Sequence, residues 1–150
     1  MRGAVLGWAG AVARRFAWAP SLVFCIHLLL SRVVGGYAAA PDLDRAVHLL
    51  GGMAFSFFAL GAAEEATRRE ILGRPAASGL FLLALLATAT AALFWEFAEF
   101  LSDRWFGTHA QGGLHDTLSD MALGVAGSCL HLAAAAWRRR RSSPRDRLSL

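Results

Sequence analysis

Four long apolar stretches, separated by short polar segments, dominate the hydrophobic pattern of the chain. They occupy residues 16–37, 46–63, 79–101 and 117–137. A helix needs about 20 largely apolar residues to cross the ~30 Å hydrocarbon core of a bilayer, and each stretch meets that length within tolerance. The pattern therefore predicts an all-α membrane protein, built as a four-transmembrane-helix bundle.

Composition agrees with this pattern. Of the 150 residues, 56% are apolar and 17% are charged, which is typical of membrane proteins. We expect a single integral membrane domain over residues 1–150. The apolar segment at 3–13 is too short to span, so we expect it to lie at the interface or to fray. A cleaved signal peptide within residues 1–40 is an alternative, which Pro41 directly after the small-residue triplet disfavours.

Small residues spaced four apart occur in three of the predicted spans. Such spacing lets two helix backbones approach closely where lipid supplies no hydrophobic drive, so it predicts helix contacts. The three pairs are Gly52 with Ser56, Ala87 with Ala91, and Gly124 with Ser128.

The positive charges predict the orientation. All of them are arginines, and most precede the first stretch, lie between the second and third, or follow the fourth, whereas Arg45 and Arg104 alone lie in the two other loops. Short cytoplasmic loops retain positive charge, so both termini should be cytoplasmic in a bacterial inner membrane. Residues 138–150 then form a basic cytoplasmic tail that anchors the chain or contacts anionic lipid. We do not expect nucleic-acid binding.

Ionisable side chains form three close pairs within or beside the spans. The pairs are Asp44 with His48, Glu96 with Glu99, and Asp116 with Asp120. Residues three or four apart share a helix face. At ~1.5 Å rise per residue, Glu96 lies about 8 Å below the outer end of its span, and His48 and Asp120 lie about 6 Å below Asp44 and Asp116. Three helices thus place acid or imidazole at a common level near the outer face.

These residue types suit a metal. Carboxylates and a histidine on facing helices of a bundle are the ligand set of carboxylate-bridged centres, and we predict Asp44, His48, Glu96, Glu99, Asp116 and Asp120 as ligands. Oxygen donors favour Mg²⁺, Ca²⁺ or Mn²⁺, whereas the imidazole lets Zn²⁺ or Fe²⁺ compete. Ionisable groups inside a span are costly unless paired or hydrated, which makes the set a candidate functional site.

Structural explanations stay open for each residue taken singly. Glu96 and Glu99 are expected either in the site or paired with Arg45 or Arg104. Asp44 and Asp116 are alternatively helix N-caps. Four further groups remain: His109 and His115 either complete the site or lie in a wet loop, and the lone histidines His27 and His131 suit helix packing better than metal binding.

Two segments carry a resemblance to a known family. "DLDRAVHLLGGMAF" and "FWEFAEFLSDRWFGTHAQGGLHDTLSDMALGVAGS", within residues 42–56 and 94–128, resemble the YjdF-type family of small bacterial inner-membrane proteins and, more distantly, VanZ-like proteins. The resemblance maps a polar signature onto Asp44, Arg45, His48, Glu96, Glu99, Asp116 and Asp120. Leu49 departs from it, because the family often has an aromatic residue there. The VanZ-like link, associated with glycopeptide tolerance, implies the cell envelope without naming a reaction.

Two functions fit these observations. The first is a metal-dependent enzyme acting on a lipid headgroup or a lipid-linked envelope intermediate, with Glu96 or Glu99 as general base and His48 as metal ligand or acid. The second is a non-catalytic membrane subunit or small transporter component whose acidic cluster binds an ion or a partner. The expected partners are membrane lipids and another membrane protein.

Overall fold

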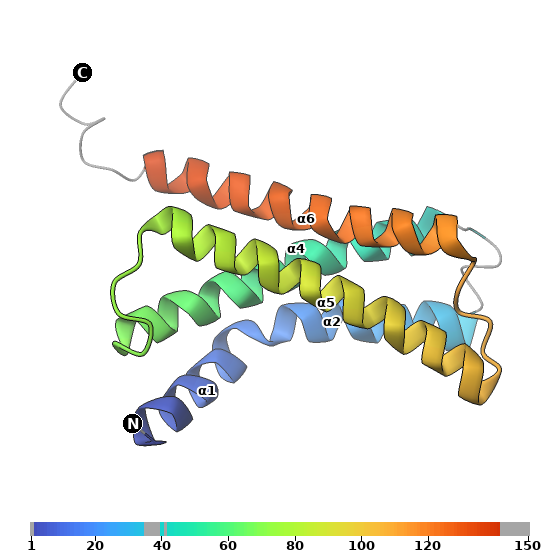
Figure 1. Cartoon of the computed structure of the whole chain (residues 1–150), viewed down its shortest axis with the longest axis horizontal. Coiled ribbons are helices and arrows are strands. Elements are labelled where there is room, and N and C mark those ends of the chain that lie inside the picture. The colour runs from blue at the N-terminus through green and yellow to red at the C-terminus, as the bar shows by residue number, and fades with distance from the viewer. Residues whose placement is uncertain (1, 35–39, 41, 142–150) are drawn as a thin grey trace.

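The protein is helical throughout the described part of the chain. The computed structural model describes residues 2–34, 40 and 42–141, and no strand occurs among them. The helices, shown in Figure 1, are α1 (Arg2–Phe16), α2 (Trp18–Leu28) with the π-helical turn η1 (Leu29–Val34), α4 (Asp42–Arg68), α5 (Ala77–Phe106) and α6 (Leu114–Arg141). The all-α class predicted from the sequence is confirmed.

Three of these helices can each cross a membrane. α4, α5 and α6 contain 27, 30 and 28 residues and are apolar over most of their length. At ~1.5 Å per residue they are roughly 40–45 Å long, which exceeds the ~30 Å hydrocarbon core. The predicted spans 46–63, 79–101 and 117–137 lie within them.

The first predicted span, 16–37, corresponds mainly to α2 and η1, which follow α1 after a sharp bend. The axis turns by 55° between Gly3–Phe16 and Trp18–Ser31. Pro20 has no N–H to donate to the carbonyl of Phe16, so the hydrogen-bond ladder is interrupted at this point. The described residues therefore contain three spanning helices, or up to four if the bent pair counts as one. Residues 35–37 of the predicted span, and 142–150 of the predicted tail, lie outside the described part.

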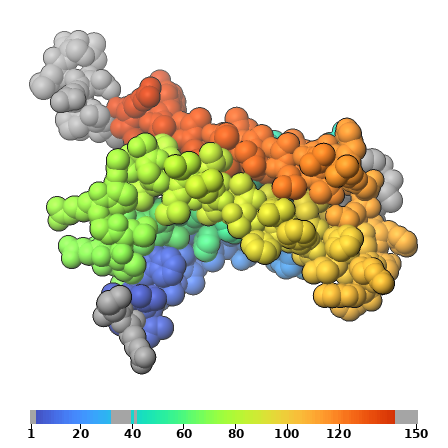
Figure 2. Space-filling model, in the orientation of Figure 1, coloured from blue at the N-terminus to red at the C-terminus, as the bar shows by residue number. Residues whose placement is uncertain are grey.

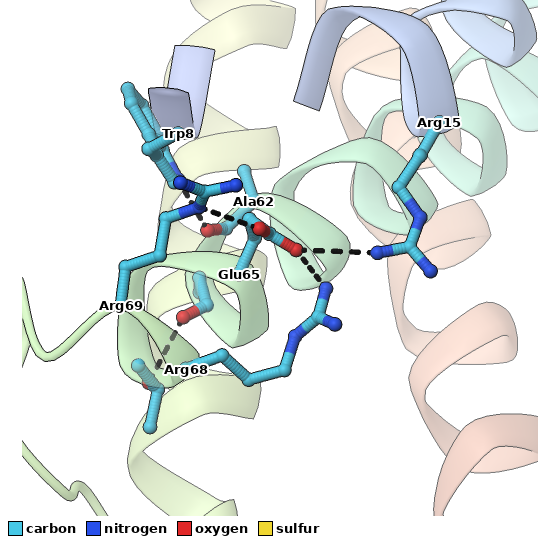
Figure 3. Close-up of polar contacts among 8 residues, drawn as sticks. Trp8, Arg15, Ala62, Glu65, Arg68 and Arg69 are labelled. Carbon is cyan, nitrogen blue, oxygen red and sulfur yellow. Dashed lines mark hydrogen bonds and ion pairs between the residues drawn. The ribbon is translucent and has the colours of Figure 1, made fainter. Parts of the chain in front are cut away.

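α1 is an ordered helix packed on α4, so residues 3–13 do not fray; their predicted position at the membrane interface stays a prediction. Ala11 and Val12 are buried, and Trp8 Nε1 donates to the carbonyl of Ala62 in α4 at 2.9 Å. The buried carboxylate of Glu65 completes this contact. Figure 3 shows the guanidinium groups of Arg15, Arg68 and Arg69 converging on it.

α4 lies at the centre and packs against each other α-helix. Its contact with α6 is made backbone to backbone: a Cβ on Gly52 would overlap the carbonyl oxygen of Gly124, and a Cβ on Gly127 would overlap that of Leu49. Ser56 and Ser128 are fully buried in the same interface. The small residues Gly52, Ser56, Gly124 and Ser128 thus lie in a close helix contact, as their spacing predicted, although the spacing did not identify which two helices meet.

Helix ends gather at two ends of the molecule. The start of α1, the α4–α5 connection and the end of α6 lie at the left in Figure 1, while the start of α4 and the α5–α6 loop lie at the right. α5 and α6 cover most of the face seen in Figure 2. α5 directs large apolar side chains such as Leu82, Leu86, Phe94 and Phe97 outward, as a lipid-facing helix does.

Candidate metal centre

The start of α4 supplies two candidate ligands. Asp44 lies in the first turn and His48 follows four residues later, so both side chains lie on one face. His48 Nε2 lies 3.7 Å from Asp44 Oδ1. Both side chains are largely buried, with 10% of His48 and 21% of Asp44 exposed.

α6 supplies the third ligand across the close α4–α6 contact. Asp120 is only 2% exposed, and its Oδ2 lies 3.8 Å from His48 Nε2. Asp120 Oδ1 is buried without a hydrogen-bond partner among the described residues. One ligand atom from each of Asp44, His48 and Asp120 lies within 4.8 Å of the other two, and this trio could hold a metal ion.

The separations in this trio suit a shared ion better than direct contact. At 3.7 and 3.8 Å, the imidazole nitrogen is beyond hydrogen-bond reach of either carboxylate. Ligand atoms at ~2.0–2.6 Å from one ion lie roughly 3–4 Å apart, which is the spacing seen here. A cation would also give Asp120 Oδ1 the partner that the chain does not provide.

Glu96 lies beside the trio on the third helix of the site. It is 4% exposed, and its Oε1 has no hydrogen-bond partner in the described part of the chain. Its carboxylate interacts electrostatically with Asp44, Asp116 and Asp120. Several acids therefore repel one another in a largely buried place, and a divalent cation would relieve this repulsion.

Glu99 interacts electrostatically with Glu96, Asp44 and Asp120, and it is held by a neighbour on its own helix. Its Oε1 accepts a hydrogen bond from Trp95 Nε1 at 2.9 Å, and the Trp95 ring meets the rings of His27 and Phe24 at 4.8 and 5.8 Å between centroids. Three residues advance a helix by about 300°, so the two glutamates diverge by about 60°. No ion pair among the described residues joins either glutamate to Arg45 or Arg104.

Asp103 organises the loop that covers this end of α5 and α6. Its carboxylate accepts hydrogen bonds from Thr108 Oγ1 and from the backbone N–H groups of Ala110 and Gln111, at 2.5, 2.6 and 2.9 Å. The Gln111 side chain donates to the Glu96 carbonyl at 3.5 Å and to Thr117 Oγ1 at 3.3 Å. This bridging role of Gln111 was not predicted, because a polar residue in a glycine-rich loop carries no signal of its target.

The remaining candidates lie at the edge of the site or outside it. Asp116 Oδ2 accepts a hydrogen bond from Gly112 N at 3.0 Å, so this carboxylate closes the loop onto α6. His109 and His115 are exposed, whereas His131 contacts Ser56 at 3.1 Å within the bundle. His27 packs edge-on against Trp95, as expected for a packing group, and it also interacts electrostatically with His48.

The helix that carries Glu96 extends beyond the predicted span. α5 continues five residues beyond 101 to Phe106, where Gly107 takes a left-handed conformation with φ 62° and its N–H bonds the Asp103 carbonyl at 3.1 Å. Glu96 therefore lies about 15 Å from the end of the helix, while its depth of about 8 Å below the end of the span stays a prediction. α4 and α6 do bring their polar groups to one level, since His48 Nε2 and Asp120 Oδ2 lie 3.8 Å apart.

The chain belongs to the DUF2238 family of predicted membrane proteins, whose model matches residues 5–141. No curated protein and no solved structure matches the chain. The match includes nearly all of the described helices and establishes a membrane protein without assigning a reaction. The resemblance to the YjdF-type and VanZ-like proteins stays a prediction.

Proposed function

We propose that this protein is a divalent-metal-dependent enzyme acting on the headgroup of a membrane lipid or lipid-linked envelope intermediate. One observation carries the proposal: Asp120 is buried with an unpartnered oxygen while its other oxygen and Asp44 flank His48 at ligand-like distances. Buried acids without hydrogen-bond partners are uncommon unless they serve a site.

Within this proposal, each residue has a distinct role. Asp44, His48 and Asp120 hold the ion, which when bound polarises a headgroup oxygen and lowers the pKa of water. Glu96, next to the trio and without a partner for Oε1, acts as the general base. Glu99 orients the neighbouring Trp95, and Asp116 holds the covering loop.

The membrane setting supports a lipid substrate. The trio lies at the opposite end of the bundle from the Glu65–arginine contact. If the arginine-rich end is cytoplasmic, the site lies at the outer leaflet of the inner membrane, where envelope intermediates are handled. The resemblance to VanZ-like proteins favours the same setting.

Metal content tests the centre. We expect protein purified in lipid nanodiscs to retain about one equivalent of divalent metal by elemental analysis, and Asp120→Asn or His48→Ala to bind it at least about tenfold more weakly. Asp42→Asn is the matched control, because Asp42 lies in the same helical turn as Asp44 but its side chain is 91% exposed. Wild-type affinity in both site variants would overturn the metal centre.

Lipid analysis tests the reaction. We expect a deletion strain to accumulate the substrate lipid, and Glu96→Gln to retain metal but fail to restore the lipid profile, because the base is lost while the ligands remain. Full restoration by Glu96→Gln would exclude Glu96 as the base. If the deletion changes no lipid although metal is bound, the enzyme proposal fails and an ion-binding subunit takes its place.

A further inference from the structure

A cavity of about 590 Å³ lies between α2, α4 and α5, within the region of the bundle that crosses the membrane. Its volume falls within the ~300–1,000 Å³ typical of ligand sites. The wall is mostly aliphatic and aromatic, with Val23, Phe24, Val47, Phe55, Ala87 and Ala91 among its residues.

Polar groups in this wall are largely occupied by neighbours. Thr88 Oγ1 donates to the Ala84 carbonyl at 2.8 Å, and the Trp95 N–H is held by Glu99. The cavity thus offers a ligand little hydrogen bonding over most of its surface. An apolar cavity of this kind excludes water and favours a hydrocarbon occupant.

His48 joins the cavity to the metal centre. It lines the cavity, and its Nε2 faces Asp44 and Asp120. His27 from α2 lines the same region. A molecule that fills the cavity therefore has its apolar part among α2, α4 and α5 and its polar end at the candidate metal centre, which is the chemistry of a lipid.

The length of the cavity also fits one lipid chain. Its lining extends from Val47 to Phe55 on α4 and from Ala87 to Ala98 on α5, about 12 and 16 Å of helix. Half of a ~30 Å hydrocarbon core is about 15 Å, the depth of one leaflet.

We infer that this cavity binds one hydrocarbon chain of the lipid whose headgroup reaches Asp44, His48 and Asp120. The inference rests on the proposed function for its headgroup end. The Phe24 and His27 rings that meet Trp95 form the contact between α2 and α5 beside the cavity. The bound hydrocarbon chain lies parallel to the helices, and the headgroup of the lipid points toward the start of α4.

Photolabelling tests the site directly. The probe is phosphatidylglycerol with a diazirine on one acyl chain, incorporated into phosphatidylcholine nanodiscs with the full-length protein. We expect mass spectrometry to find the label on the cavity-lining residues within Val47–Phe55 of α4 and within Ala87–Ala98 of α5. A diazirine-bearing hydrocarbon without a headgroup should label them about tenfold less, since one lost polar contact of about 1.4 kcal/mol has that effect.

Filling the cavity supplies the decisive variant. A Cβ on Gly51 meets only Val23 Cγ1, at 3.8 Å, so Gly51→Leu extends into the space and should reduce wall labelling about tenfold. Gly79→Leu is the control, because its Cβ also meets only one atom, Pro75 Cβ at 3.8 Å, away from the cavity. If Gly51→Leu fails to fold, Gly51→Ala replaces it as a smaller change. Its labelling should lie between that of the wild type and full loss.

The outcomes separate this inference from the metal centre. Unchanged wall labelling in folded Gly51→Leu, or equal labelling by the headgroup-free hydrocarbon, overturns the lipid-chain site whatever the metal content. Wild-type metal affinity in both Asp120→Asn and His48→Ala overturns the metal centre instead, even where labelling is intact. Loss of labelling in Gly51→Leu with metal retained supports the chain-binding site independently.

Discussion

At the scale of single residues, two consecutive glutamates have different surroundings. Glu65 is 4% exposed and meets Arg15 of α1, Arg68 of α4 and Arg69 of the following turn. The Glu64 side chain is 41% exposed and pairs with one arginine of the described chain, Arg139. Removing the charge of a buried carboxylate leaves the arginines that pair with it without a counter-charge. An exposed pair contributes little.

Glu65→Gln should therefore release α1 from α4. We expect a loss of about 2 kcal/mol in unfolding free energy, below the full ~3–5 kcal/mol of a broken buried pair because Arg15 and Arg68 are more than half exposed. Glu64→Gln, its neighbour, should cost less than about 1 kcal/mol. Unfolding in detergent and hydrogen exchange of α1 measure both. Equal effects of the two variants would contradict this account.

The contacts of the metal centre could be predicted from the sequence only in part. Spacing correctly predicted that Asp44 and His48 share a face, and their geometry follows from four-residue periodicity within one helix. The rotation of α6 about its axis relative to α4 is a tertiary property, so the sequence alone could not distinguish Asp120 from Asp116 as the residue facing His48. The bond that Glu99 Oε1 accepts from Trp95 Nε1 is likewise a property of local packing that spacing alone does not predict.

At the scale of helices, the α4–α6 contact sets the geometry of the metal centre. Gly127 lies two turns beyond Asp120, and a Cβ there would overlap the carbonyl oxygen of Leu49 and come within 2.9 Å of Met53 N. Backbone atoms cannot move aside as a flexible side chain can, so the helices themselves must separate.

Gly127→Ala should thus weaken both stability and metal binding. We expect a loss of about 1–3 kcal/mol in unfolding free energy, and several-fold weaker Mn²⁺ binding because Asp120 moves away from His48. Gly51→Ala is the matched control, since a Cβ there makes only ordinary contact with Val23. Thermal unfolding and Mn²⁺ titration followed by electron paramagnetic resonance are the measurements. Indistinguishable behaviour of the two variants would exclude this contact as the determinant.

Helix boundaries were predictable only in part. Hydropathy finds the segment that fits a bilayer, and it placed 79–101 within α5. The helix continues to Phe106 because nothing between them breaks it, and it ends where Gly107 provides a left-handed cap. The bend before α2 had a local signal in Pro20, whereas the packing of α1 against α4 depends on Glu65 and arginines distant in sequence.

At the scale of the whole molecule, two polar centres occupy opposite ends of the bundle. The Glu65–arginine contact lies near the end of α4, and the metal centre lies where α4 begins. The bent pair α1–α2 runs from the end with the Glu65–arginine contact toward the end with the metal centre. The start of α1 therefore lies at the same end of the molecule as the C-terminal end of α6 (Figure 1). Charge distribution predicts that this end is cytoplasmic.

Cysteine labelling in intact cells tests this orientation. In a chain with Cys25 and Cys129 replaced by alanine, Ala110→Cys in the α5–α6 loop should react with a membrane-impermeant maleimide, because this loop closes the outer end beside the metal centre. Ala76→Cys in the α4–α5 connection should react only after the cells are permeabilised, and Gly3→Cys should match it if α1 and α2 together cross once. Labelling of Gly3→Cys without permeabilisation would make the bent pair a re-entrant segment and leave three crossings. Labelling of Ala76→Cys but not Ala110→Cys would invert the molecule, and a substrate would then have to reach the metal centre from the cytoplasmic leaflet.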